Sequence, residues 1–360
     1  MTHHDVNGGN HNAAAVWERK VATHHAAVTR RLCLGGAATL IAAGAAAGAA
    51  ALADDLPPVR LGILQFGTVQ WLSEVMRQHA LDRQNGFALE TALLANTDAG
   101  RIALLAKAAD IVVSDWMFVA AQRAAGVKLC FAPFSSSTGG VMVPQSSTIR
   151  TLPDLANHRL GVAGGPLDKS WLVVRAAAKV SSEMNLAETA QVVYGAPPLL
   201  NAKLLQGELD AVLTYWNFAA RLEASGCREV ASVESCAQRL GMPPAMPLIG
   251  FVFHEEWATR NKAAIGGFLS AASTAQTLLA HRPETWQGIR SLMDAPMDAS
   301  GDALFEALRR RFIAGIANPS ADAQQHAAEQ LFAVLVRTGG PRATDGLAHL
   351  PPGIFWSTNG

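Results

Sequence analysis

The chain has few charged residues and no excess of either sign of charge. Only 16% of its 360 residues are Asp, Glu, Lys or Arg; 29 are basic and 29 acidic, so the formal net charge is zero. Proteins that bind nucleic acid or anionic membranes through their charge carry extended basic patches. The composition therefore argues against nucleic acid and against a membrane surface as partners.

Cysteines are also few, and the common catalytic motifs are missing. The four cysteines form no Cys-x-x-Cys pair and no cluster with histidine, which are the spacings typical of thiolate metal sites. The chain contains no Gly-x-Ser-x-Gly, no His-Glu-x-x-His and no Gly-x-Gly-x-x-Gly sequence. We therefore expect no catalytic residues, no metal and no cofactor.

The N-terminus has the organisation of an export signal. Residues 1–28 are polar, and Arg30 and Arg31 then precede an Ala/Gly-rich apolar run that ends in a small-x-small signal at Ala53. Paired arginines indicate the twin-arginine route. We expect residues 1–53 to be a twin-arginine-type signal peptide, cleaved after Ala53, which places the protein in the periplasm. The alternative is an N-terminal membrane helix; Cys33 precedes the apolar run and does not indicate a lipoprotein anchor.

A repeat in the remaining sequence indicates two similar halves. Residues 104–126 recur in order at residues 204–226, with Asp110 matching Asp210. Each copy has the pattern of a helix, a short apolar strand, a polar-aromatic loop and a second helix. Strands that alternate with helices predict an α/β fold with mostly parallel sheets, in which ligands bind beyond the carboxyl ends of the strands. Two such lobes form one cleft between them.

Two crossings between the lobes set the expected domain boundaries. One lies near residues 127–143 and the return near residues 248–253. Lobe 1 then comprises residues 54–140 and 248–350, and lobe 2 comprises residues 141–247.

The sequence after the return crossing is largely helical. Residues 255–280, 302–315 and 321–336 have helical patterns, and their apolar faces are expected to pack on lobe 1. The Pro-rich tail from Pro351 onward is expected to be loose.

Five segments carry a resemblance to a known family, and residues 149–162 illustrate it by reading I-x-x-L-x-D-L-x-x-x-x-x-G-V. The segments are residues 104–113, 136–143, 149–162, 206–212 and 253–283. In this order and spacing the chain resembles the type II periplasmic binding proteins of the nitrate, sulfonate, taurine and thiamine-pyrimidine group. The resemblance implies a receptor that captures a small solute for an ABC transporter permease in the inner membrane by hinge closure; we expect a monomer.

The sequence departs from this family at one point. Tyr215-Trp216-Asn217 stands where the family often has a Trp-Glu-Pro-like stretch, so no particular substrate is carried over.

Candidate ligand-binding residues occupy the loops that follow strands, where aromatic faces and hydrogen-bonding groups meet the cleft. They are Gln65, Phe66, Thr97, Asp98, Asp115, Trp116, Ser136, Ser137, Thr138, Gly165, Asp168, Tyr215, Trp216 and Asn217. Each group has a structural alternative. Trp116 and Trp216 open helices and would then lie in the core, Asp98 would cap a helix, and the Ser136–Thr138 run would be an interdomain loop.

Other conspicuous residues are assigned structural roles. Trp71 and Trp171 lie a turn into their helices and are expected in the core. Asp110 and Asp210 recur before a strand and are expected to stabilise a turn. The acidic residues Asp98, Asp115 and Asp168 outnumber Lys169 and Arg101 near the expected cleft, which favours a neutral or cationic solute.

Two questions stay open in the sequence. An oxidising periplasm allows Cys227 and Cys236 to form a disulfide, and the alternative is two free thiols. The function has alternatives as well: an accessory or sensor protein that presents its ligand to a periplasmic enzyme or receptor, or, less favoured, an enzyme.

Overall fold

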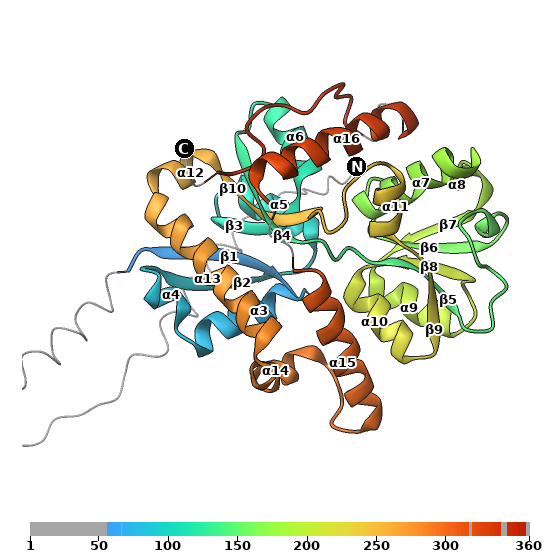
Figure 1. Ribbon diagram of the computed structural model, residues 1–360, viewed down its shortest axis with the longest axis horizontal. Coiled ribbons are helices and arrows are strands. Elements are labelled where there is room, and N and C mark those ends of the chain that lie inside the picture. Colours follow the sequence, from blue (N-terminus) through green and yellow to red (C-terminus); the bar gives the residue numbers. More distant parts are fainter. Residues whose placement is uncertain (1–55, 66, 317–318, 340–343, 358–360) are drawn as a thin grey trace, which may run out of the picture. The chain divides into compact units, whose positions relative to one another are not determined.

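The structure is a computed structural model that describes residues 56–65, 67–316, 319–339 and 344–357 (Figure 1). The expected signal peptide, its cleavage site at Ala53 and the candidate ligand residue Phe66 lie outside the described residues. The described residues contain two five-stranded sheets, each covered by helices (Figure 1).

The first sheet is mixed. β1 pairs in parallel with β2 and β3, whereas β10 runs antiparallel to β3 and β4. Its strands, in spatial order, are β2 (Ala88–Leu94), β1 (Pro58–Leu64), β3 (Ile111–Asp115), β10 (Ile249–His254) and β4 (Leu129–Ser135). The helices between its strands are α3 (Val69–Gln78), α4 (Leu81–Gln84), α5 (Thr97–Leu105) and α6 (Trp116–Ala124). We call this sheet and its helices the first lobe.

The second sheet repeats this arrangement. β6 pairs in parallel with β7 and β8, whereas β5 runs antiparallel to β8 and β9. Its strands, in spatial order, are β7 (Gln191–Gly195), β6 (Arg159–Ala163), β8 (Ala211–Thr214), β5 (Gly140–Pro144) and β9 (Cys227–Ser232). Its helices are η1 (Pro153–Leu155), α7 (Lys169–Ser182), α8 (Leu186–Thr189), α9 (Pro197–Leu205), α10 (Trp216–Ala224) and α11 (Val233–Arg239). This is the second lobe.

The crossing segments give each sheet its antiparallel strand. After β4 the chain leaves the first sheet and enters the second as β5; after β9 and α11 it returns as β10. β5 holds the place in the second sheet that β10 holds in the first. The predicted class of two similar α/β lobes is confirmed.

Two matching ion pairs explain why the repeat conserves an aspartate. Asp110 accepts hydrogen bonds from the main-chain N–H and the guanidinium of Arg60, at 2.6 to 3.0 Å. Asp210 makes the same contacts with Arg159, at 2.7 to 3.1 Å. Each pair ties the start of a parallel strand to the turn before its neighbour. The predicted structural role of both aspartates is confirmed.

The helices after β10 pack on the first lobe, as predicted, and two of them also reach the second. They are α12 (Glu255–Arg260), α13 (Lys262–His281), α14 (Pro283–Ile289), η2 (Arg290–Met293), α15 (Ala299–Ala314) and α16 (Ala321–Gly339). α13 is long and apolar enough to span a bilayer, but Phe268 and Leu279 are buried as in a core helix. α15 lies along α10, and α16 lies along α7.

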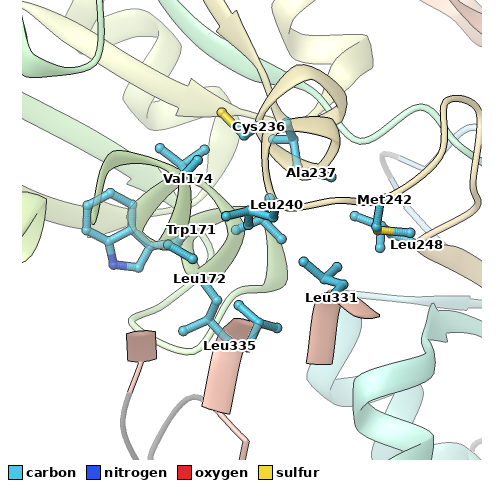
Figure 2. Packing of buried hydrophobic residues seen from close by; sticks show 14 of the residues in the cluster. Trp171, Leu172, Val174, Cys236, Ala237, Leu240, Met242, Leu248, Leu331 and Leu335 are labelled. Carbon is cyan, nitrogen blue, oxygen red and sulfur yellow. The ribbon is translucent and has the colours of Figure 1, made fainter. Parts of the chain in front are cut away.

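The contact between α16 and the second lobe is apolar. Leu331 and Leu335 of α16 face Leu172 of α7 and Leu240 after α11, and all four side chains are at most 7% exposed (Figure 2). Trp171 is fully buried on the same helix α7, as predicted. The periodic apolar face of α16 predicts that it is buried, but it does not identify the surface that covers it.

The C-terminal tail is ordered where the structure describes it. Phe131 in the edge strand β4 donates its N–H to the Ile354 carbonyl at 2.7 Å and accepts from the Trp356 N–H at 2.8 Å. Ile354 is fully buried, and the Phe131 and Phe355 rings meet edge to face. The expectation of a loose tail is wrong here because the tail pairs with the free edge of the first sheet.

Candidate functional site

A hollow of about 210 Å³ lies between the two lobes. The first lobe contributes the loop after β1 and the first turn of α3, and the second lobe contributes the first turns of α9 and α10. We call it the interlobe pocket. Its lining residues are Gln65, Gly67, Thr68, Gln70, Trp71, Pro198, Asn217, Phe218, Arg221, Leu292 and Asp294.

Three helices begin at this pocket. The residues before α3, α9 and α10 are Thr68, Ala196 and Tyr215, and none of them caps its helix with a side-chain hydrogen bond. None of these three helices has an acidic residue in its first turn. Helix N-termini carry a partial positive charge and unpaired N–H groups, so they attract anionic groups. α3 and α10 offer such N–H groups, whereas α9 begins with Pro197 and Pro198, which have none. The local electrostatics of the pocket therefore favour negative charge.

One guanidinium lines the pocket. Arg221 donates to the Met293 carbonyl at 2.7 Å and lies 3.8 Å from the carboxylate of Asp294. Asp294 is 80% exposed, so solvent screens its charge. Burial lowers the pKa of Arg221 from its usual value, an effect partly opposed by Asp294. Arg221 remains a cation because an arginine pKa starts far above neutrality.

Trp71 lines the pocket, and two further aromatic rings pack against it. Trp71 of α3 and Trp216 of α10 meet edge to face, with centroids 5.9 Å apart, and both rings contact Phe312 of α15. Trp71 is 3% exposed and donates its indole N–H to the Leu292 carbonyl at 3.1 Å, which confirms its predicted place in the core. Trp216 is 8% exposed, so it holds the lobes together with only an edge accessible.

The predicted acidic residues of the cleft loops are all paired. Asp115 caps α6 through the Phe118 N–H at 2.9 Å and accepts from Arg101 at 2.9 Å. Asp98, which is 83% exposed, lies 3.6 Å from the same Arg101.

In the second lobe, Asp168 has two partners. It caps α7 through Ser170 and accepts from the Tyr215 hydroxyl at 3.2 Å. Burial raises the pKa of Tyr215, and the Asp168 carboxylate raises it further. Lys169 lies over the Tyr215 ring, 5.7 Å from its centroid. The phenol therefore stays protonated as a donor to Asp168.

The serine run lies at the crossing from β4 to β5. Ser136 donates through its N–H and its hydroxyl to the Gly315 carbonyl, at 2.9 and 3.3 Å, and Ser137 donates to the Arg311 carbonyl at 3.0 Å. These two hydroxyls are thus used to bind the end of α15. The hydroxyl of Thr138 is buried and has no partner among the described residues.

The remaining candidates lie apart from one another. Trp116 is fully buried next to Phe332 of α16, so its ring has no surface for a solute in this conformation. Thr97 is the first residue of α5 and is half-buried. A Cβ at Gly165 would meet open space. Of the candidates, the structure brings Gln65 and Asn217 together at the pocket.

Nine of the eleven lining residues were not among the candidates from the sequence: Gly67, Thr68, Gln70, Trp71, Pro198, Phe218, Arg221, Leu292 and Asp294. Arg221 lies five residues after Trp216 on α10, so a search along that helix finds it. Asp294 comes from the connection after η2, far from every predicted loop, and no local pattern indicates it.

The three described cysteines are free thiols. Cys227 begins β9 and Cys236 lies in α11, in different hydrophobic clusters. The alternative of two free thiols is the one found in the structure. No group of three or more His, Cys, Asp and Glu side chains in the described part of the chain is arranged to hold a metal.

Buried thiols are expected to resist alkylation. Burial raises the pKa of Cys130 and of Cys236 to about 11, so about one thiol in a thousand is ionised at pH 8. We expect iodoacetamide at pH 8 to leave both unmodified in the folded protein and to label both in denaturant, as read by peptide mass spectrometry. Rapid labelling of folded protein would contradict this burial. A Cys236 that is labelled in denaturant only after reduction would instead indicate a disulfide.

The fold and the pocket define a two-lobed α/β protein with a small cavity between its lobes. Residues 83–285 match a family model described as NMT1/THI5 like, and the match covers more than half of the chain. The chain belongs to the NMT1/THI5-like family. No curated protein sequence matches it.

Solved structures share this fold at low sequence identity. The alkanesulfonate-binding protein SsuA from Xanthomonas axonopodis pv. citri bound to MOPS has 19% identity and a TM-score of 0.62, over 83% of this chain and 98% of that chain. The periplasmic aliphatic sulphonate binding protein SsuA from Escherichia coli has 16% identity and a TM-score of 0.63, over 82% and 97%. The periplasmic nitrate-binding protein NrtA from Synechocystis PCC 6803 has 11% identity and a TM-score of 0.58, over 81% and 86%. The predicted resemblance is confirmed.

Proposed function

We propose that this protein is the substrate-binding component of an ABC import system, without catalytic activity. It captures a small organic solute in the interlobe pocket when the lobes close. The observation that carries the proposal is the pocket itself, a cavity of about 210 Å³ whose walls come from both lobes. Closure around a ligand at the junction of two lobes is a recurrent hinge motion. The fold and the family support the same role.

The proposal includes the expected location and partner. The export signal at residues 1–53 would bring the chain to the periplasm as a monomer, where it would deliver its solute to an inner-membrane permease. Lobe 1 would comprise residues 54–140 and 248–350, and lobe 2 residues 141–247.

For the solute, we propose an acidic group. The sequence favoured a neutral or cationic solute because of Asp98, Asp115 and Asp168, but each of these carboxylates has a cationic or hydrogen-bonding partner. At the pocket itself, the N-termini of α3 and α10 and the Arg221 guanidinium lie at the cavity, against a single exposed carboxylate, Asp294. A carboxylate, sulfonate or similar oxyanion satisfies these donors.

A thermal-shift screen of the full chain tests the proposal. The panel contains alkanesulfonates, nitrate, aromatic carboxylates, pyrimidines and amines. A solute at about 100 times its dissociation constant adds about 2.7 kcal/mol of stability, which raises the melting temperature by about 4 °C in a chain of this size. We expect one acidic compound to give a saturable shift.

Arg221→Gln provides the matched test of the pocket. It should abolish the shift, whereas Arg260→Gln should keep it, because Arg260 is 73% exposed on α12 outside the pocket. A shift given only by amines would overturn the acidic-group proposal and leave the receptor proposal intact. If every compound fails after unfolding and refolding to remove a retained ligand, the receptor proposal is wrong.

A further inference from the structure

α15 contacts both lobes, by aromatic packing and by ion pairs. In the N-terminal half, Asp302 pairs with Arg290 at 2.6 Å, and the Arg290 guanidinium lies 4.8 Å from the centroid of the Phe305 ring. Near the C-terminal end of α15, Phe312 meets Trp286 of α14 edge to face, with centroids 5.5 Å apart. These contacts anchor α15 on α14 and η2, which pack against the first lobe.

The C-terminal half of α15 meets the second lobe through the Phe312 ring, whose centroid lies 6.1 Å from that of Trp216, and through ion pairs. Arg310 lies 3.1 Å from Glu223, and Arg311 lies 3.0 Å from Glu223 and 3.3 Å from Glu229. Glu223 belongs to α10 and Glu229 to β9. These three ion pairs join α15 to the second lobe near the crossing between the lobes. At the same place the Ser137 hydroxyl donates to the main-chain carbonyl of Arg311.

The four charged side chains are partly accessible. Arg311 and Glu229 are 23% and 28% exposed, and Glu223 and Arg310 are 38% and 62% exposed. Groups with this exposure are rehydrated readily when a pair separates, and dissolved salt screens them. Separation of Phe312 from Trp216 of the second lobe would instead expose largely apolar aromatic rings. If the lobes move apart, the ion pairs are therefore the contacts of α15 that open at lower cost.

We propose that Arg310 and Arg311 of α15, with Glu223 and Glu229 of the second lobe, form an electrostatic latch that favours the closed lobes. The proposal rests on the hinge closure proposed above. The aromatic contact of Trp71 with Trp216 stabilises the closed form in a way that does not depend on salt. The latch adds a stabilisation of the closed form that does depend on salt. Solute affinity then falls as ionic strength rises, even for a solute without charge, because binding requires the closed form.

The latch is tested without any solute by small-angle X-ray scattering of the full chain. We expect the radius of gyration to increase between about 50 and about 500 mM NaCl, as the screening length shortens from more than 10 Å to less than 8 Å. Glu223→Gln removes the partner of both arginines and should give the larger radius already at low salt, with little further change. Glu306→Gln is the matched control, because Glu306 lies on the same helix and pairs only with Arg309 of that helix in the described contacts.

Arg310→Gln serves as a second variant, since it removes one exposed partner and keeps the buried face of α15 intact. It should give an intermediate radius. If Glu223→Gln and Arg310→Gln both match the wild type at low salt while remaining folded by circular dichroism, the latch proposal is overturned.

Solute binding provides an independent readout. Glu223→Gln should weaken the affinity about fivefold at low salt and by less at high salt, since partly exposed pairs contribute little singly and more as a network. An unchanged affinity at low salt would overturn the link between the latch and binding. The scattering result does not depend on an identified solute, so failure of the latch and failure of the receptor proposal are distinguishable.

Discussion

Gly139→Ala is expected to destabilise the protein by about 3 kcal/mol or more, or to prevent recovery of folded protein. Gly139 has φ +118°, a conformation that L-residues rarely adopt. A Cβ at this position would lie 2.0 Å from the Thr214 carbonyl oxygen and 2.9 Å from the Trp216 main-chain nitrogen. Both neighbours are backbone atoms of β8 and α10, so no side-chain rotation relieves the overlap. Urea denaturation followed by circular dichroism measures the loss.

Alanine substitutions at two other glycines distinguish the cost of backbone strain from the cost of steric overlap at Gly139. Gly86 has φ +77° with open space around it, so Gly86→Ala reports the backbone strain alone, about 1 kcal/mol. Gly266 lies within α13 with nothing near its Cβ position, so Gly266→Ala should be neutral or stabilise by up to about 1 kcal/mol. If Gly139→Ala costs no more than Gly86→Ala, the close approach of the crossing to α10 is wrong.

Trp216→Ala is expected to cost about 3 to 5 kcal/mol of stability and to weaken solute binding strongly. The ring is 8% exposed and packs on Trp71 and Phe312, whose centroids are 5.9 and 6.1 Å away. Its removal leaves a cavity between the lobes that these fixed aromatic neighbours cannot fill. Urea denaturation measures the stability, and isothermal titration of the solute measures the affinity at a temperature where the variant is folded.

A conservative change identifies the origin of the effect. Trp216→Phe keeps an aromatic ring against Trp71 and should retain most of the stability. Met297→Ala is the control for a change in apolar surface away from the interior, because Met297 is 85% exposed and should change stability by less than about 0.5 kcal/mol. A loss below about 1 kcal/mol in Trp216→Ala would show that the aromatic contact between the lobes is weak.

The duplicated architecture was predictable because its signal is local and occurs twice. The apolar strands, the polar loops after them and the aspartates Asp110 and Asp210 recur in the same order in both halves. A parallel sheet requires such alternation, and an aspartate before a strand has a partner close by in the fold. The antiparallel position of β5 and β10 was harder to predict, because the sequence of a strand does not indicate which sheet the strand joins.

The partners of polar side chains were the least predictable feature. Ser136 and Ser137 have the composition of a ligand-binding loop. The Ser137 hydroxyl nevertheless donates to the main-chain carbonyl of Arg311, which lies 174 residues further along the chain. Trp116 opens a helix as Trp216 does, but α16 covers the first and leaves an edge of the second accessible. Nothing local to either tryptophan distinguishes the two.

The sequence by itself determined the two α/β lobes and the family resemblance, because hydrophobic period and repeat spacing act over short distances. Only the tertiary structure decided that α15 and α16 reach the second lobe, that the tail from Ile354 completes the edge of the first sheet, and that Arg221 and Asp294 line the pocket. These features depend on which surfaces meet when the chain is packed. An apolar face or a hydrogen-bonding group must be buried or paired, but many partners elsewhere in the chain satisfy that requirement equally well until the fold selects one.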